Sequence, residues 1–198
     1  MTTVYFVRHA QPDHAWQDDR TRPLTQEGLA DSHVVLEALR GKPIDVCYSS
    51  PYQRSRDTIA ETAAHFGLEI HTDERLRERV KGKEGNNHGM FRLRWADHDF
   101  HEPGGESIRM VQERNVAALR EILAENPGKG ILVGTHGTAL SSILNHYDPA
   151  FGCDDFLRII DWMPYVIALT FDGQTLVGKE EICHVTKEFK GSARADKK

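Results

Sequence analysis

The chain has 198 residues, of which 39% are hydrophobic, and this content suffices for the core of a soluble globular protein. It excludes a disordered or fibrous chain. Thirty acidic residues against 25 lysines and arginines give a formal net charge of −5, which argues against a general nucleic-acid-binding or acidic-lipid-binding surface.

The first residues resemble no targeting segment, because they lack a basic stretch and the first apolar run stops at Arg8. The longest stretch without a formal charge, residues 130–147, contains His, Asn, Ser and Thr, so we do not expect it to cross a membrane. The three cysteines, Cys47, Cys153 and Cys183, share no close spacing and suggest neither a disulfide framework nor a zinc site. A reducing, cytoplasmic compartment fits this usage best.

Strands and helices are expected to alternate along most of the chain. The hydrophobic pattern predicts, in chain order, a strand at 2–7, a helix at 25–40, a strand at 44–48, a helix from Ser50-Pro51 to Gly67, a strand at 69–72, a helix from 106 to about 126, a strand at 130–135, a helix at 138–147, and two strands at 165–171 and 175–182. Asp172-Gly173 predicts a hairpin between the last two.

Two helix starts carry recognisable signals. Thr25 is a plausible N-cap for the helix at 25–40, and Gly41 is a plausible stop. Ser50 followed by Pro51 favours a hydroxyl cap and a proline in the first turn of the next helix. In the helix at 25–40, one face is expected to carry the buried leucines, which are Leu29, Leu36 and Leu39.

Alternating strands and helices predict an α/β protein, a three-layer α/β/α sandwich with a mainly parallel sheet. We expect a single domain over residues 1–186 and a flexible tail over 187–198. Residues 73–104 are charged, rich in Gly and His, and without a sustained period. A loop of this length in a compact domain is commonly functional, so we expect an insertion at the active site.

Histidines and arginines follow the ends of the predicted strands. Arg8 and His9 follow the first strand, His136 follows the strand at 130–135, and Arg54 lies shortly after the strand at 44–48. Because ligands in open α/β sheets bind at the carboxyl ends of the strands, we expect these side chains to share one site.

Two guanidinium groups and an imidazole form a cation cluster suited to a phosphoryl group. The helix starts at Pro51 and Gly137 would add backbone N–H groups to the same anion, and the second imidazole would be free to act as a nucleophile. Each residue alone has a simpler explanation: a lone histidine is commonly packed, and Arg54 has Asp57 and Glu61 on its own helix. Their shared placement favours a functional role.

Six sequence elements, taken together, resemble those of the histidine phosphatase superfamily, the phosphoglycerate-mutase-like proteins. The elements span nearly the whole chain, and in order they are Arg8-His9-Ala10, Leu24-Thr25-Gln26-Glu27-Gly28, Ser49-Ser50-Pro51 with Arg54 and Thr58, Leu76-Arg77-Glu78 with Gly82 and Glu84-Gly85, Gly104-Gly105-Glu106-Ser107, and Thr135-His136-Gly137.

The resemblance implies a role for each matching residue. His9 would be phosphorylated during turnover, while Arg8, Arg54, His136 and Gly137 would surround the phosphoryl group. Glu78 would be the general acid and base, a role that its place in a charged segment does not itself indicate. This chemistry requires neither a metal nor another cofactor.

The chain also departs from the family pattern. Ala10 replaces a glycine, while Pro12 and Ala15 stand where the family has a hydroxyl residue and an asparagine that contacts phosphate. Gln11 is the candidate replacement for that contact.

Hydrolysis of a phosphomonoester is favoured over a mutase reaction. The resemblance to mutases would imply a longer chain and two adjacent arginines in the insertion, whereas Leu93 separates Arg92 from Arg94 here. The Gly-Gly-Glu-Ser element is also more typical of the phosphatases. Two alternatives stay open at this stage: a metal-dependent hydrolase using His98, Asp99, His101 and Glu102, and a module that only binds phosphorylated ligands.

The insertion contains a basic run, whose members are Arg79, Lys81, Lys83, His88, Arg92 and Arg94. It is either a solvated loop or a rim that attracts anionic substrates. Met90, Phe91 and Trp95 would be an apolar wall for the substrate or part of the core. The expected partner is a small phosphorylated metabolite, and the sequence fixes neither its identity nor the oligomeric state.

Overall fold

A six-stranded sheet forms the centre of the computed structural model, which describes residues 1–83 and 85–187. The strands lie in the order β3-β2-β4-β1-β5-β6; the pairs from β3 to β1 are parallel, and β5 and β6 are antiparallel. Their bounds are Thr2–Arg8 (β1), Val46–Ser49 (β2), Ile70–Thr72 (β3), Gly130–Thr135 (β4), Trp162–Asp172 (β5) and Thr175–Thr186 (β6).

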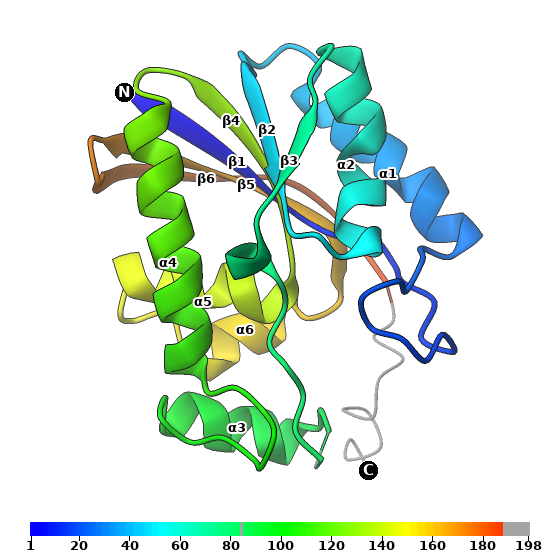
Figure 1. The fold of residues 1–198 in the computed structure, drawn as a ribbon, viewed down its shortest axis with the longest axis vertical. Helices are drawn as coiled ribbons and strands as arrows, with labels where there is room; N and C mark the ends of the chain where they lie inside the picture. Colours follow the sequence, from blue (N-terminus) through cyan, green and yellow to red (C-terminus); the bar gives the residue numbers. More distant parts are fainter. Residues whose placement is uncertain (84, 188–198) are drawn as a thin grey trace.

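Helices cover both faces of this sheet (Figure 1). One face is covered by α1 (Gln26–Leu39) and α2 (Gln53–His65), and the other by α4 (Ile108–Glu125), α5 (Gly137–Tyr147) and α6 (Cys153–Ile159). Side chains of β1 alternate between the two cores: Val4 and Phe6 face α4 and α5, while Tyr5 and Val7 face α1 and α2. The expected three-layer sandwich is confirmed.

The start of α1 agrees with its sequence signal. Thr25 is the N-cap, and its hydroxyl accepts a hydrogen bond from the Gly28 N–H at 3.0 Å. Leu36 and Leu39 are buried, but Leu29 is 54% exposed, so its expected place in the core is wrong. The first turn instead packs through Gly28, where a Cβ would lie 2.3 Å from the carbonyl oxygen of Gln11.

The start of α2 differs from expectation. The helix begins at Gln53 with Tyr52 as its N-cap, and no side chain caps it. Ser50 lies two residues before that N-cap, and its hydroxyl contacts His136, as described below. The expected hydroxyl cap at Ser50, with Pro51 in the first turn, is therefore wrong, because a tertiary contact engages this hydroxyl.

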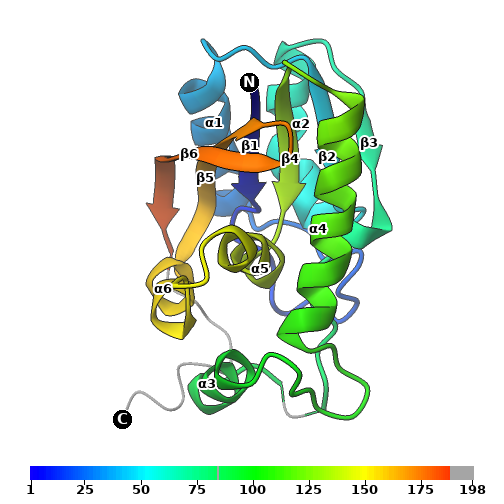
Figure 2. The same ribbon diagram turned by 90° about the vertical axis from the view of Figure 1, so that its left-hand side faces the viewer.

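The region expected to be a loop, residues 73–104, contains two short helices. A 3-10 helix spans Glu74–Leu76, and α3 spans His88–Ala96 below the sheet (Figure 2). Phe91 and Trp95, one helical turn apart, are buried against Phe156 of α6. They are therefore core residues. The helical period of hydrophobic residues was hard to recognise in the sequence because Arg94, which is also buried, lies next to Trp95.

The sequence also missed α6 and shortened both strands of the final hairpin, whose turn uses Gly173 at φ 58°. Lys187, placed at the start of the expected tail, is tied down: its N–H donates to the Asp161 carbonyl at 2.7 Å, and its ammonium lies 2.9 Å from Asp31. The rest of that tail, 188–198, lies outside the described residues. Among the helices described, none combines the length and apolar character needed to span a membrane.

Candidate active site

Three neighbouring strands deliver the candidate residues to one edge of the sheet. Arg8 ends β1 and pairs in register with Thr135, which ends β4, so His9 and His136 follow from adjacent positions. Their rings lie 5.3 Å apart, edge to face. Arg54 enters from the first turn of α2, beyond the end of β2. We call Arg8, His9, Arg54 and His136 the strand-end cluster.

A pocket of about 200 Å³ opens over this cluster. Arg8, His9, Arg54 and Glu78 all line it, so the structure brings together four of the residues that the sequence singled out. His136 is fully buried behind the pocket wall. Other parts of the wall come from two loops, and these residues are Pro12, His14, Asp19, Arg22, Arg79, Lys81, Gly85 and Asn86.

His9 is held as a neutral imidazole, and no hydrogen bond is recorded for its Nε2 within residues 1–83 and 85–187. Its Nδ1 lies 2.7 Å from the Ala10 carbonyl oxygen, which only accepts hydrogen bonds, so Nδ1 carries the proton. Burial, and then the charges of Arg54 and Arg8, hold the pKa of His9 well below its ordinary value. Nε2 therefore keeps its lone pair at neutral pH, as nucleophilic catalysis requires.

The chain after His9 is fixed by α2. The Ala10 N–H donates to the Thr58 hydroxyl at 2.9 Å, and that hydroxyl donates to the Arg54 carbonyl at 2.7 Å. Thr58 is fully buried. The backbone that follows His9 and the Arg54 guanidinium are thus both held by α2.

His136 has a buried donor position without a partner. Its Nε2 lies 2.7 Å from the Ser50 hydroxyl, which also accepts the Tyr52 N–H at 3.2 Å. When that hydroxyl donates to Nε2, the imidazole proton resides on Nδ1, a buried atom with no hydrogen-bond partner among the described residues. Burial and the Arg54 charge lower the pKa of His136, so this donor is neutral. A phosphoryl oxygen would satisfy it.

The two guanidinium groups are both buried. Arg8 donates from Nη1 to the Ile159 carbonyl at 2.6 Å, and its buried Nε has no hydrogen-bond partner in the part of the chain described. Burial lowers the pKa of Arg8 to about 10. Arg54 donates to the Asp19 carbonyl at 2.6 Å, lies 3.3 Å from the Asp19 carboxylate and stacks 5.1 Å from the Tyr52 ring centroid. Two permanent cations therefore flank His9.

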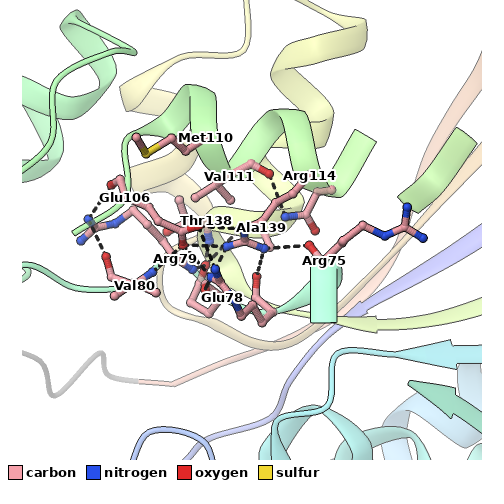
Figure 3. A network of polar contacts seen from close by, with 12 residues as sticks. Arg75, Glu78, Arg79, Val80, Glu106, Met110, Val111, Arg114, Thr138 and Ala139 are labelled. Carbon is pink, nitrogen blue, oxygen red and sulfur yellow. Dashed lines mark hydrogen bonds and ion pairs between the residues drawn. The ribbon is translucent and has the colours of Figure 1, made fainter. Parts of the chain in front are cut away.

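Glu78 is anchored at the start of α5. Its carboxylate accepts the N–H groups of Arg79 at 2.8 Å, Thr138 at 3.0 Å and Ala139 at 3.1 Å (Figure 3). The N-terminal N–H groups of α5 at 138 and 139, which the sequence assigned to the phosphoryl group, are thus used by a carboxylate. Gly137 allows the Arg8 guanidinium to approach the helix closely, since a Cβ at this position would lie 3.3 Å from that group.

Gln11 lies outside the pocket lining. Its side-chain oxygen accepts the Thr25 hydroxyl at 2.9 Å, and its carbonyl accepts the Thr25 N–H at 3.0 Å. The residue thus anchors the start of α1. The pocket receives His14 and Asp19 from the loop that follows β1, and the sequence reasoning missed both. Their place after a strand that ends in Arg-His was the available signal.

Two members of the basic run are buried in the protein. Arg79 and Arg94 are buried, both bond to Glu102, and both donate to the Asn86 side-chain oxygen at 3.1 Å. We call Arg79, Arg94 and Glu102 the insertion cluster. Arg92 pairs with Asp154 at the surface, whereas Lys81 is exposed and lines the pocket. Neither alternative, a solvated loop or a cationic rim, applies to Arg94, whose charge is matched by a buried carboxylate.

The same geometry bears on the metal alternative. Glu102 is engaged by Arg94, and Asp99 pairs with Arg109. Within residues 1–83 and 85–187, no group of three or more His, Cys, Asp or Glu side chains is arranged to hold a metal ion.

The family model described as the histidine phosphatase superfamily (branch 1) matches residues 4–160. A 2,3-bisphosphoglycerate-dependent phosphoglycerate mutase of Parvibaculum lavamentivorans is 29% identical over 73% of this chain and 79% of its own length. A putative phosphoserine phosphatase 2 of Hydrogenobacter thermophilus is 27% identical over 93% and 98%. Among solved structures, Bacillus stearothermophilus YhfR superposes with a TM-score of 0.73 at 25% identity, covering 89% of this chain and 95% of YhfR.

Proposed function

Because the chain belongs to the histidine phosphatase superfamily (branch 1), we propose that it hydrolyses small phosphomonoesters through a phosphohistidine intermediate on His9. One observation carries the proposal: His9 is a neutral imidazole at a pocket wall, with its Nδ1 proton bonded to a carbonyl and its Nε2 without a hydrogen bond to any described residue. Arg8 and Arg54 flank it as buried cations. This arrangement suits attack on a phosphorus atom whose oxygens carry negative charge.

In the first step, His9 Nε2 attacks phosphorus as the bond between phosphorus and the ester oxygen breaks. Glu78, when protonated, gives its proton to the departing oxygen, which leaves as an alcohol. Arg8, Arg54 and the Nδ1–H of His136 stabilise the negative charge on the three remaining oxygens. The product of this step is phosphorylated His9.

In the second step, the Glu78 carboxylate takes a proton from a water molecule, which attacks the same phosphorus. The bond between phosphorus and Nε2 breaks, so the electron pair returns to His9 and inorganic phosphate is formed. Protons balance over the cycle because Glu78 gives one and recovers one. Neither a metal nor another cofactor is required.

The alternative is a phosphoglycerate mutase-type transfer, since most of the similar curated relatives carry a mutase name, among them those of Parvibaculum lavamentivorans and Yersinia pestis. Hydrolysis is favoured because the relative with a phosphatase name aligns over nearly the full length of both chains. The insertion arginines also support it: Arg94 is engaged by Glu102 and Arg92 by Asp154, and neither lines the pocket. Both names describe phosphorylated acids of low molecular weight, a size that suits a pocket of about 200 Å³.

Rapid acid-free quenching during turnover tests the proposal. We expect phosphate on the protein that is labile to acid and stable to base, mapped by mass spectrometry to His9. The His9→Asn variant should lose this label and, on the order of 10⁴-fold or more, turnover. His71→Asn, which removes an exposed imidazole, is the matched control. A labelled His9→Asn protein, or one with full turnover, would reject His9 as the nucleophile.

Incubation with 3-phosphoglycerate separates the two reactions. Hydrolysis predicts release of inorganic phosphate with little 2-phosphoglycerate. Rapid formation of 2-phosphoglycerate, with or without added 2,3-bisphosphoglycerate, and without comparable phosphate release would favour the mutase.

A further inference from the structure

Arg114 holds the backbone on which Glu78 is mounted. Its Nη1 donates to the carbonyl oxygens of Arg75 at 2.7 Å and Arg77 at 2.6 Å, and its Nη2 donates to the carbonyl of Glu78 at 3.0 Å (Figure 3). One planar guanidinium therefore contacts three carbonyls within four consecutive residues. A lysine, with a single nitrogen, lacks the fork that this pattern requires.

Glu106 secures the same segment from the other side. Its carboxylate accepts two hydrogen bonds from Arg114, both at 2.9 Å, two from Arg77 and one from the Val80 N–H at 2.8 Å. Burial raises the pKa of Glu106, but these hydrogen bonds outweigh it and lower the pKa to about 2. The carboxylate is therefore ionised throughout the neutral range and stays paired with Arg114.

The two ends of Glu78 are thus held by different elements. Arg114 projects from α4 and holds the backbone, whereas the N-terminal N–H groups of α5 hold the carboxylate. Val111 and Ala118, on either side of Arg114 in α4, are fully buried, so this part of the helix is packed into the protein. Neither Arg114 nor Glu106 lines the pocket, so neither would contact the substrate directly.

We propose that Arg114, paired with Glu106, is a positioning residue that sets the place of Glu78 for proton transfer to the leaving oxygen. The inference rests on the proposed function, because it takes Glu78 as the general acid. Displacement of a catalytic group by about 1 Å can cost on the order of 100-fold in rate. The segment from 77 to 80 has little regular structure of its own, so its position depends on these contacts.

Leaving-group dependence distinguishes this role from a purely structural one. An alkyl phosphate releases an alkoxide that needs a proton, whereas p-nitrophenyl phosphate releases a stable phenolate that does not. The measurement is the single-turnover rate of phosphohistidine formation from each substrate. Arg114→Lys keeps the positive charge but removes the forked guanidinium group. Glu106→Gln keeps the size and shape of the side chain but removes its negative charge. Glu78→Gln is the reference, and Arg109→Lys, an exposed arginine of α4 paired with Asp99, is the matched control.

We expect Arg114→Lys and Glu106→Gln to slow phosphorylation by the alkyl phosphate about 10- to 100-fold, and phosphorylation by p-nitrophenyl phosphate less than about threefold. Glu78→Gln should show the same selectivity more strongly, and Arg109→Lys should show none. The isosteric Glu106→Gln protein keeps the test valid if Arg114→Lys does not fold.

Equal losses with both substrates, or no loss with either, would overturn the positioning role while leaving phosphohistidine chemistry intact. If Glu78→Gln shows no selectivity, Glu78 is not the acid, and the inference fails with that assignment. If the wild-type protein forms no phosphohistidine from either substrate, the proposed function itself is rejected, which is a separate and recognisable outcome.

Discussion

The strand-end cluster and the insertion cluster both bury two arginines, but they satisfy them differently. In the insertion cluster, Arg79 and Arg94 share the carboxylate of Glu102, whose side chain is 1% exposed. In the strand-end cluster, Arg8 Nε and His136 Nδ1 are buried without a hydrogen-bond partner, and no atom of the insertion cluster is in that condition among the described residues.

We infer from this difference that the strand-end cluster is the ligand site and that Arg94 and Glu102, which do not line the pocket, have a structural role. Buried polar atoms in proteins are nearly always hydrogen-bonded, so two unsatisfied nitrogens on either side of His9, which lines the pocket, favour the binding of an anion there. Arginines whose hydrogens are taken by carboxylates and carbonyls have little capacity left for a substrate. Counting buried arginines would not distinguish the two clusters, whereas accounting for their partners does.

The sharpest test of the comparison removes a cation from the strand-end cluster. We expect Arg54→Met to lower kcat/KM on the order of 1,000-fold, because the variant loses a charge that stabilises the phosphoryl oxygens. The free energy of unfolding should change by less than about 1 kcal/mol, since the Asp19 side chain is 32% exposed and regains water. Steady-state kinetics and urea denaturation measure the two quantities.

Arg56→Met, an exposed neighbour on the same helix, is the control and should leave both values unchanged. A destabilised Arg54→Met protein with nearly normal kcat/KM would reverse the assignment of this cluster.

The corresponding change in the insertion cluster should act on stability. Arg94→Met leaves the buried Glu102 carboxylate with only its longer contact to Arg79, and we expect a loss of about 3–5 kcal/mol in the free energy of unfolding. Turnover by the remaining folded protein should fall less than about tenfold, because Arg94 does not line the pocket.

Arg92→Met provides the comparison, since its side chain is 63% exposed and pairs with an exposed Asp154. It should change stability by less than about 1 kcal/mol. Similar stabilities for Arg94→Met and Arg92→Met would show that Glu102 does not depend on its partner.

Because the imidazoles of the strand-end cluster are buried, we expect the free energy of unfolding to fall as the pH is lowered below 6.5. Burial holds the pKa of His9 below its ordinary value of 6.5. Below that pH, the unfolded chain therefore binds a proton that the folded protein does not bind. This group's contribution to stability is complete above pH 6.5 and is lost as pH falls. One pH unit lower, the loss is about 1.4 kcal/mol for one histidine.

Urea denaturation at several pH values measures this dependence. The His9→Asn protein should lose about one proton from the slope below pH 6.5, whereas the exposed His71→Asn protein serves as the control. Identical slopes for wild type and His9→Asn would mean that His9 is protonated as readily in the folded state as in the unfolded one.

The smallest effect is expected at the mouth of the pocket. Lys81 is the exposed member of the basic run that lines it, so Lys81→Gln should raise KM for a multiply charged phosphate ester about two- to threefold at low ionic strength. In the wild type, KM should rise with salt, and in the variant less so. Lys83→Gln, exposed two residues away, is the control; equal salt responses in all three proteins would remove the idea of a cationic mouth.

Local patterns were sufficient for most of the fold. Continuous apolar runs predicted β1 and β4, and a threonine before the apolar period predicted the α1 cap, because these features depend on neighbours in the sequence. The same reasoning missed α3 and α6. The apolar side chains of α3 are few and lie beside Arg94, whose burial depends on Glu102 eight residues later.

The same distinction, between local patterns and contacts over long sequence separations, applies to the candidate site. Residues at the ends of parallel strands were predictable from the sequence, because the register of β1 and β4 forces Arg8 and Thr135 to be neighbours. Glu78 was found only through the family resemblance, since nothing in its own segment distinguishes it from a solvated carboxylate. Its carboxylate accepts hydrogen bonds from Thr138 and Ala139, which lie 60 and 61 positions later in the chain. No local sequence pattern predicts contacts over such a separation.

By itself, the sequence determined the layers, the strand ends and the presence of two histidines and two arginines at one edge of the sheet. Only the tertiary structure decided which arginines are bound to carboxylates and which keep unsatisfied donors. It also decided that Arg114 lies against the Glu78 backbone. The physical reason is that hydrogen bonds over long sequence separations depend on distances of about 3 Å, which are fixed only when the packed elements come together.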